Sequence, residues 1–310
     1  MNGKIMYQQT RQLLQEGETS NFIDERTTFD YLFEAACQFA MDTKILTASM
    51  EITTVADQAE YDLNANFIGL QVKNDTNEPL VRYYDGTNYY FLTWRDQDPI
   101  WEAHATAGVA IPSNFTITDG DVKVPLTGTA TSAGAASNGV CTLTDATKTF
   151  ISSGVNPGDQ ISNETDVSDG VVLSVTSETK LVVALFGGTG NDWTNADAYT
   201  LTRQVCKKLV LDPYPSADGD KVVIKYIRKP APVYSDYGTY PIPDTYLPSI
   251  IKYAAFLYKY RDREPNFGDY LYKHWDMMVR KANNLENRMP NRGKWKVNMK
   301  KRSLVDRSWR

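Results

Sequence analysis

Apolar residues recur every three or four positions in four stretches of the chain, and this spacing predicts four helices. Two of these stretches lie near the beginning of the sequence and two near its end. Glycine and proline mark several of their ends, because both residues interrupt a helix. The four helices are expected at residues 4–16, 28–40, 245–260 and 266–289.

Between the two pairs of helices the hydrophobic period drops to two, which is the pattern of strands half buried in a sheet. Asp85-Gly86 is a strong turn signal, so Leu80–Tyr84 and Tyr89–Leu92 are expected to form a hairpin. Residues 115–118 and 209–211 are expected to be neighbours in one sheet, although a long stretch of chain separates them. Further strands are expected at residues 50–54, 67–73 and 221–227.

The composition changes at Asp119. Residues 119–204 are rich in Gly, Ala, Ser and Thr, poor in Lys and Arg, and contain short β-branched runs separated by turn residues. This pattern is typical of a small all-β barrel or sandwich. Its strands are expected at residues 139–144, 160–163, 171–176, 180–185 and 199–202.

Together these patterns predict an α+β fold. The N- and C-terminal helices are expected to form a helical bundle that carries a small antiparallel β subdomain. Residues 1–118 and 205–290 would make up this discontinuous body, interrupted by the all-β insertion at 119–204. Residues 291–310 would form an extended C-terminal arm.

The end of the chain differs sharply in charge from the rest. From residue 288 onward there are nine basic residues and one acidic residue, a net charge of +8, so residues 1–287 carry −13 of the total of −5. Trp295 and Trp309 are interleaved with these charges, and exposed aromatic area is unfavourable in water. We therefore expect a docking arm rather than a solvated terminus. Its partner-binding residues are expected to be Arg292, Lys294, Trp295, Lys296, Lys300, Lys301, Arg302, Leu304, Arg307, Trp309 and Arg310.

Composition argues against several other classes of protein. A pI near 5.2 is unsuited to a body that coats nucleic acid. No apolar run is long enough to span a bilayer, and residues 1–17 lack the apolar core of a signal peptide, so neither membrane insertion nor secretion by that route is expected. The three scattered cysteines are expected to be free thiols in a reducing compartment.

Signals for catalysis are sparse. The two histidines, His104 and His274, stand alone, and no spacing of His, Cys or carboxylates matches a metal site. We therefore predict no catalytic, cofactor-binding or metal-binding residue. The nineteen tyrosines exceed the needs of a core and favour protein interfaces.

The body resembles the head-to-tail adaptor (connector, or neck) proteins of tailed bacteriophages. Three segments carry the resemblance: the helix around Phe29–Ala40, the strand–turn–strand L-V-L-D-P-Y-P-S-A-D-G-D-K-V-V-I-K-Y-I-R-K-P at Leu209–Pro230, and the helix I-P-D-T-Y-L-P-S-I-I-K-Y-A-A-F-L-Y at Ile242–Tyr258. The inserted β segment is similar to small modules that recur in phage structural proteins, and it departs from the basic adaptor pattern.

The resemblance implies a structural virion protein without enzymatic activity, assembled in the host cytoplasm. Twelve copies would form a ring under the portal, with the C-terminal arm in clefts between portal subunits. The ring would complete the DNA-filled head and offer a platform to tail, nozzle or fibre proteins. DNA would pass through its channel during packaging or ejection without sequence-specific binding.

Two alternatives come from other functional classes. In the first, the chain is a tail-associated protein whose insertion binds receptors or glycans. Asp96, Asp98 and Glu102, which lie near Trp94 and Trp101, could instead serve a cell-wall-degrading virion enzyme of the glycosidase type. An arm that binds DNA directly would lose affinity steeply with salt.

Overall fold

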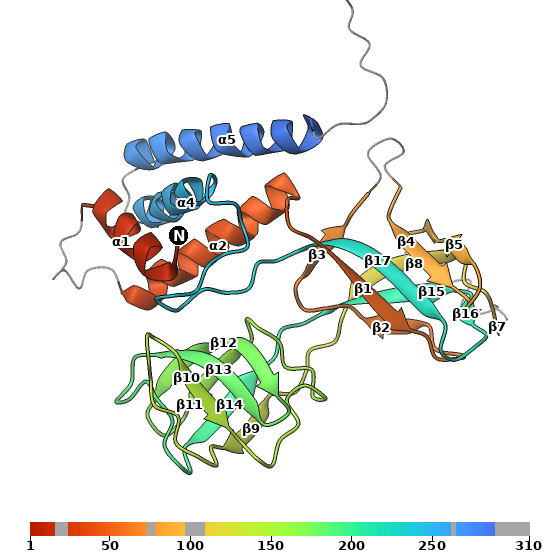
Figure 1. The fold of residues 1–310 in the computed structure, drawn as a ribbon, viewed down its shortest axis with the longest axis horizontal. Helices are drawn as coiled ribbons and strands as arrows, with labels where there is room; N and C mark the ends of the chain where they lie inside the picture. The colour runs from red at the N-terminus through yellow and green to blue at the C-terminus, as the bar shows by residue number, and fades with distance from the viewer. Residues whose placement is uncertain (16–23, 73–77, 97–108, 262–264, 289–310) are drawn as a thin grey trace, which may run out of the picture.

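The computed structural model describes residues 1–15, 24–72, 78–96, 109–261 and 265–288. This part of the chain contains four helices and seventeen strands, and the strands form four sheets. Figure 1 shows three regions: a layer of helices, a β-sandwich at the opposite end of the long axis, and an inserted β module beside the helices.

The sandwich is built from strands that precede and follow the insertion. One sheet has the order β1-β17-β4-β5, and β3 also pairs with β17; the other has the order β2-β15-β8-β6. Inward-facing side chains of both sheets, among them Phe115, Leu209 and Ile224, form one buried core. The strands are β1 (Thr47–Thr53), β2 (Glu60–Asp62), β3 (Phe67–Leu70), β4 (Val81–Tyr84), β5 (Tyr89–Phe91), β6 (Thr93–Trp94), β8 (Asn114–Asp119), β15 (Lys207–Asp212) and β17 (Lys221–Arg228). A short parallel pair, β7 (Val109–Ala110) and β16 (Tyr214–Pro215), lies beside them.

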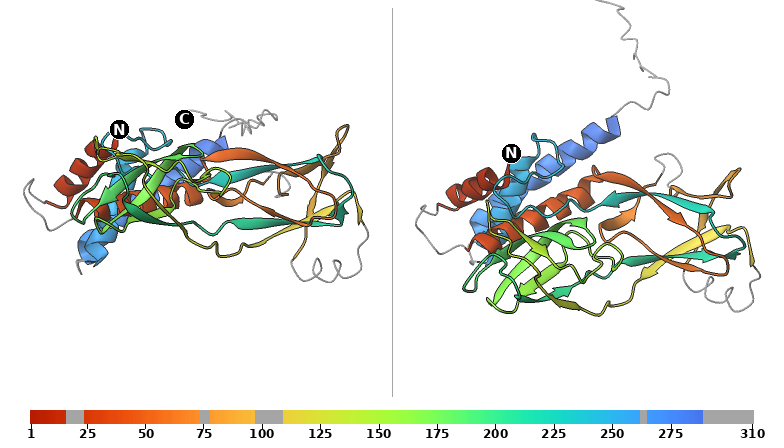
Figure 2. Two further views of the ribbon diagram at one scale, coloured as in Figure 1. Left: turned by 90° about the horizontal axis from the view of Figure 1, so that it is seen from below. Right: turned by 60° about the horizontal axis from the view of Figure 1, so that its bottom comes forward.

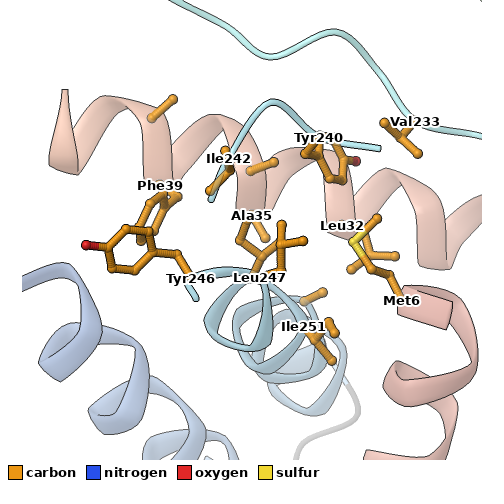
Figure 3. Packing of buried hydrophobic residues seen from close by; sticks show 14 of the residues in the cluster. Met6, Leu32, Ala35, Phe39, Val233, Tyr240, Ile242, Tyr246, Leu247 and Ile251 are labelled. Carbon is orange, nitrogen blue, oxygen red and sulfur yellow. The ribbon is translucent and has the colours of Figure 1, made fainter. Parts of the chain in front are cut away.

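The four helices, α1 (Gly3–Leu13), α2 (Glu25–Thr43), α4 (Leu247–Arg261) and α5 (Pro265–Arg288), pack around a second core. α2 buries Leu32, Ala35 and Phe39 along one face, as its spacing predicts. Leu247 and Ile251 of α4 pack against this face, and the segment that leads from β17 into α4 covers it with Tyr240 and Ile242 (Figure 3).

The inserted module is a six-stranded sheet in the order β10-β13-β12-β11-β14-β9. It curls around its own core until the chain leaving β9 reaches β10, where Ser132 bridges to Thr144. Its strands are β9 (Leu126–Thr129), β10 (Cys141–Thr144), β11 (Gln160–Asn163), β12 (Ser168–Ser177), β13 (Lys180–Phe186) and β14 (Ala198–Thr202).

The module packs against the helical layer. Val171 and Ala184 on its outer face belong to the helical core, and Phe186 lies 6.0 Å from Tyr234, measured between ring centroids. Figure 2 shows the module lying against the helices in both views.

The expected helical bundle with a small antiparallel β subdomain is wrong, because the fold is mostly β. Strands from both sides of the insertion join into a two-sheet sandwich. Five strands of this region, β2, β5, β6, β7 and β16, are two or three residues long, and so short a run shows no period of two by itself.

Other expectations about local structure are confirmed. Phe115 pairs with Leu211 and Ile117 with Leu209, so β8 and β15 are adjacent although the whole module separates them in sequence. The hairpin at Asp85-Gly86 joins antiparallel strands β4 and β5. No helix in the described ranges combines the length and apolarity needed to cross a bilayer.

Candidate docking surface

Metal-binding side chains do not converge in the described part of the chain. No group of three or more His, Cys, Asp or Glu residues there is arranged to hold a metal ion. His274 lies half-buried on α5, and its Nδ1 is buried without a hydrogen-bond partner among the described residues. Burial and the nearby charge of Lys252 lower the pKa of His274, which favours a neutral ring.

The thiols are equally unsuited to catalysis. Burial raises the pKa of Cys37 and of Cys141 to about 12, and it also raises the pKa of Cys206. A reactive cysteine needs a thiolate, and these environments disfavour it. All three cysteines are free, as the sequence predicts.

The carboxylates of the glycosidase alternative are not brought together by any described contact. Asp96 is exposed after β6, whereas Asp98, Trp101, Glu102 and His104 lie outside the described residues. The candidate residues of the docking arm, Arg292 to Arg310, also lie outside them.

The most distinctive surface of the described chain is a cluster of aromatic side chains at the outer end of the sandwich. We call Tyr84, Tyr89, Tyr90, Phe91 and Trp94, which lie on the consecutive strands β4, β5 and β6, the aromatic edge. Tyr84, Tyr89 and Phe91 share one face of their sheet, whereas Tyr90, opposite the buried Tyr83, lies on the other face. Tyr89 is 59% exposed, Phe91 53%, Trp94 41% and Tyr90 37%. Isolated exposed apolar residues are normal, but a cluster of large ones marks an interaction site.

The hairpin fixes the geometry of this edge. Asp85 accepts main-chain hydrogen bonds from Thr87 at 2.8 Å and Asn88 at 2.6 Å, and Gly86 supplies the positive φ that the turn requires. The resulting register places Tyr84 opposite Tyr89, and their rings stack with centroids 4.6 Å apart.

The same register pairs Arg82 with Phe91, and the guanidinium carbon lies 4.5 Å from the centroid of the Phe91 ring. This cation–π contact orders an exposed ring. Trp94, on the second sheet, packs edge-to-face against Phe115 of the core, with centroids 5.5 Å apart. The aromatic edge is therefore held in place before any partner arrives, which lowers the entropy cost of binding.

The structure divides the tyrosines that the sequence analysis singled out. Tyr83 is buried, and its hydroxyl donates to Asp220 at 2.6 Å, whereas its neighbours in the hairpin face solvent. Tyr237 and Tyr270 are also exposed, at 68% and 66%, but away from this hairpin. Phe91 was missed as a surface residue, and its pairing with Arg82 across a predicted turn could have indicated its position.

Comparison with known proteins does not place the chain in a family. No protein-family model matches it, and no curated protein matches its sequence significantly.

Proposed function

We propose that the chain is a non-enzymatic structural protein of a phage virion, a head-to-tail adaptor that docks under the portal as a ring. The observation that carries this proposal is the aromatic edge, an ordered, exposed surface in a fold whose described residues hold no group arranged to bind a metal ion. The support is a surface and a charge pattern, since the described residues form a mostly β fold and not the expected helical bundle with a small β subdomain.

The aromatic edge suits contact between copies or with a neighbouring virion protein. Tyr and Trp side chains are enriched among the residues that dominate binding energy, because they bury a large area at small entropic cost. A ring needs a heterologous contact, in which one patch meets a different patch on the next copy. In the proposed ring the aromatic edge is one of these two patches.

Charge supports the remainder of the proposal. Residues 288–310 carry a net charge of +8 and include two tryptophans, which suits anchoring in acidic clefts of a portal. The rest of the chain carries −13, and an acidic channel wall repels DNA phosphates and lets the duplex slide. Tail, nozzle or fibre proteins would then attach to the outer surface of the ring.

Mass measurement by light scattering tests the proposal. The purified chain should have a mass near 34.9 kDa alone and should join a portal ring as several copies when mixed with it. A chain truncated at Pro290 should remain folded and lose portal association. Normal portal binding by the truncated chain would overturn the role of the arm, and no binding by the full chain would overturn the adaptor itself.

A further inference from the structure

A cavity of about 250 Å³ lies where three regions of the molecule meet. α2 contributes Phe33 to its wall, and the other walls come from the sandwich and the inserted module. We call it the junction cavity. Its polar lining residues are Asn64, Asn66, Asn156, Gln204, Arg228 and Lys229.

Hydrogen bonds hold the amide side chains of this lining in place. On the sandwich side, Asn66 Oδ1 accepts from the Tyr226 hydroxyl at 2.9 Å, and Asn64 Nδ2 donates to the same hydroxyl at 3.1 Å. On the module side, Gln204 Nε2 donates to the main-chain oxygen of Pro157 at 3.2 Å and to Asp159 Oδ1 at 3.3 Å, and Asn156 Nδ2 donates to the main-chain oxygen of Gly154 at 2.9 Å. Hydrogen bonds therefore fix the cavity wall on the sandwich side and on the module side.

Two adjacent cations, Arg228 and Lys229, face this cavity, and its lining contains no carboxylate. Both side chains are half-buried, and neither forms an ion pair with any residue that the structure describes. The charge of Lys229 is close enough to lower the pKa of the buried Cys37 and Cys206 thiols against the larger effect of burial.

Two partly buried like charges side by side repel each other, and an anion bound between them relieves this repulsion. Guanidinium and ammonium groups make their strongest hydrogen bonds to phosphate and carboxylate oxygens. The volume is slightly below the roughly 300–1,000 Å³ of pockets for drug-sized ligands, so a small anion fits.

We propose that the junction cavity binds a small oxyanion, a phosphate or a carboxylate group, between Arg228 and Lys229. The Nδ2 of Asn66 would donate a further hydrogen bond, because its Oδ1 already accepts from Tyr226. Since Asn156 and Gln204 form the opposite wall, the bound anion ties the module to the sandwich and stabilises their relative position.

Titration of the full chain with sodium phosphate tests this proposal, with sodium chloride of equal ionic strength as reference. Binding to the folded state raises the midpoint of thermal unfolding. The midpoint should therefore rise with phosphate more than with chloride, and calorimetry should show one saturable site. A parallel titration with malonate distinguishes a site for phosphate from one for carboxylates. No response to either anion beyond that to chloride would overturn the proposal.

Variants locate the site. Arg228→Gln and Lys229→Gln should each weaken phosphate binding at least tenfold. Lys225→Gln, which removes an exposed charge from the same strand outside the cavity, should bind as the wild type does. Equal responses in all three variants would mean surface binding and overturn the proposal.

Asn66→Asp provides a test that does not depend on removing a cation. The new carboxylate keeps the acceptor for Tyr226 and places a negative charge beside Arg228 and Lys229. It should raise the unfolding midpoint without phosphate and abolish the response to phosphate. A variant that still binds phosphate like the wild type would contradict the assigned site.

Discussion

In the inserted module the large aromatic rings lie inside, whereas at the outer end of the sandwich they lie in solvent. Phe150, Trp193 and Tyr199 are almost fully buried in the module, but Tyr89 and Phe91 are more than half exposed. The large exposed apolar residues of the module, such as Ile151, are aliphatic. The module thus encloses its rings in its own core, whereas the aromatic edge presents its rings to solvent.

The two regions also treat polar groups differently. The module buries three aspartates, Asp145, Asp159 and Asp197, and each accepts main-chain hydrogen bonds that close a turn. At the aromatic edge the corresponding turn residue, Asp85, closes an exposed hairpin. The same side-chain chemistry thus stabilises a sealed module in one place and presents a surface in the other.

Truncating a ring in the module should produce the largest loss of stability. Phe150→Ala removes a fully buried ring that packs 6.4 Å from Tyr199, and we expect it to cost about 3–5 kcal/mol of unfolding free energy. The neighbouring Ile151→Ala changes an exposed side chain and should stay within about 0.5 kcal/mol. Urea denaturation measures both, and similar losses would contradict the difference in burial.

Removing a buried carboxylate should have an intermediate effect. Asp145 accepts from Thr147 main-chain N–H at 2.9 Å and from the Tyr199 hydroxyl at 2.8 Å. Asp145→Ala leaves the buried hydroxyl without this acceptor and should cost about 1–3 kcal/mol. Asp85→Ala, at the exposed turn, is the matched control and should cost less.

The same aspartate gives the module a predictable response to acid. Burial tends to raise the pKa of Asp145, but the hydrogen bonds from Thr147 and Tyr199 outweigh it and lower the pKa. A lowered folded-state pKa stabilises the fold above the unfolded value of about 3.9, and this stability is lost as the pH falls through the folded value. Denaturation at several pH values between about 7 and 2.5 measures this effect. Below about pH 4 the unfolding free energy should fall less in Asp145→Asn than in the wild type.

Changing the aromatic edge should affect stability least. Tyr89→Ser and Phe91→Ser alter side chains that are mostly in water and remove one ring stack and one cation–π contact, so each should cost about 1 kcal/mol or less of unfolding free energy. A loss of several kcal/mol in the same denaturation series would mean that these rings belong to the core. It would contradict the difference in burial between the aromatic edge and the module.

Local sequence signals predicted the elements that depend on neighbouring residues. The face of α2, the hairpin at Asp85-Gly86 and the strand 160–163 all follow from such signals. β9 was missed because L-T-G-T carries a glycine in a very short strand. That glycine, Gly128, is required by packing, since an added Cβ would lie 2.5 Å from the Tyr199 hydroxyl oxygen.

Features formed by distant segments could not be predicted in this way. β7 pairs with β16 across the whole insertion, and a two-residue strand carries no periodic signal. The junction cavity joins Phe33, Asn64, Asn156 and Arg228, which no spacing in the sequence relates. The surplus of tyrosine indicated an interface, but only the fold separates the buried Tyr83 from the exposed Tyr89.

The most direct test of the central claim compares ring assembly by two variants in which exposed apolar side chains are replaced by serine. One carries Tyr89→Ser with Phe91→Ser, and the other carries Ile151→Ser on the module surface. Light scattering of each, alone and with a portal ring, should show that the first keeps its monomer mass but fails to complete the ring, while the second assembles like the wild type. Normal ring assembly by the Tyr89 and Phe91 variant would contradict the assignment of the aromatic edge as the contact surface.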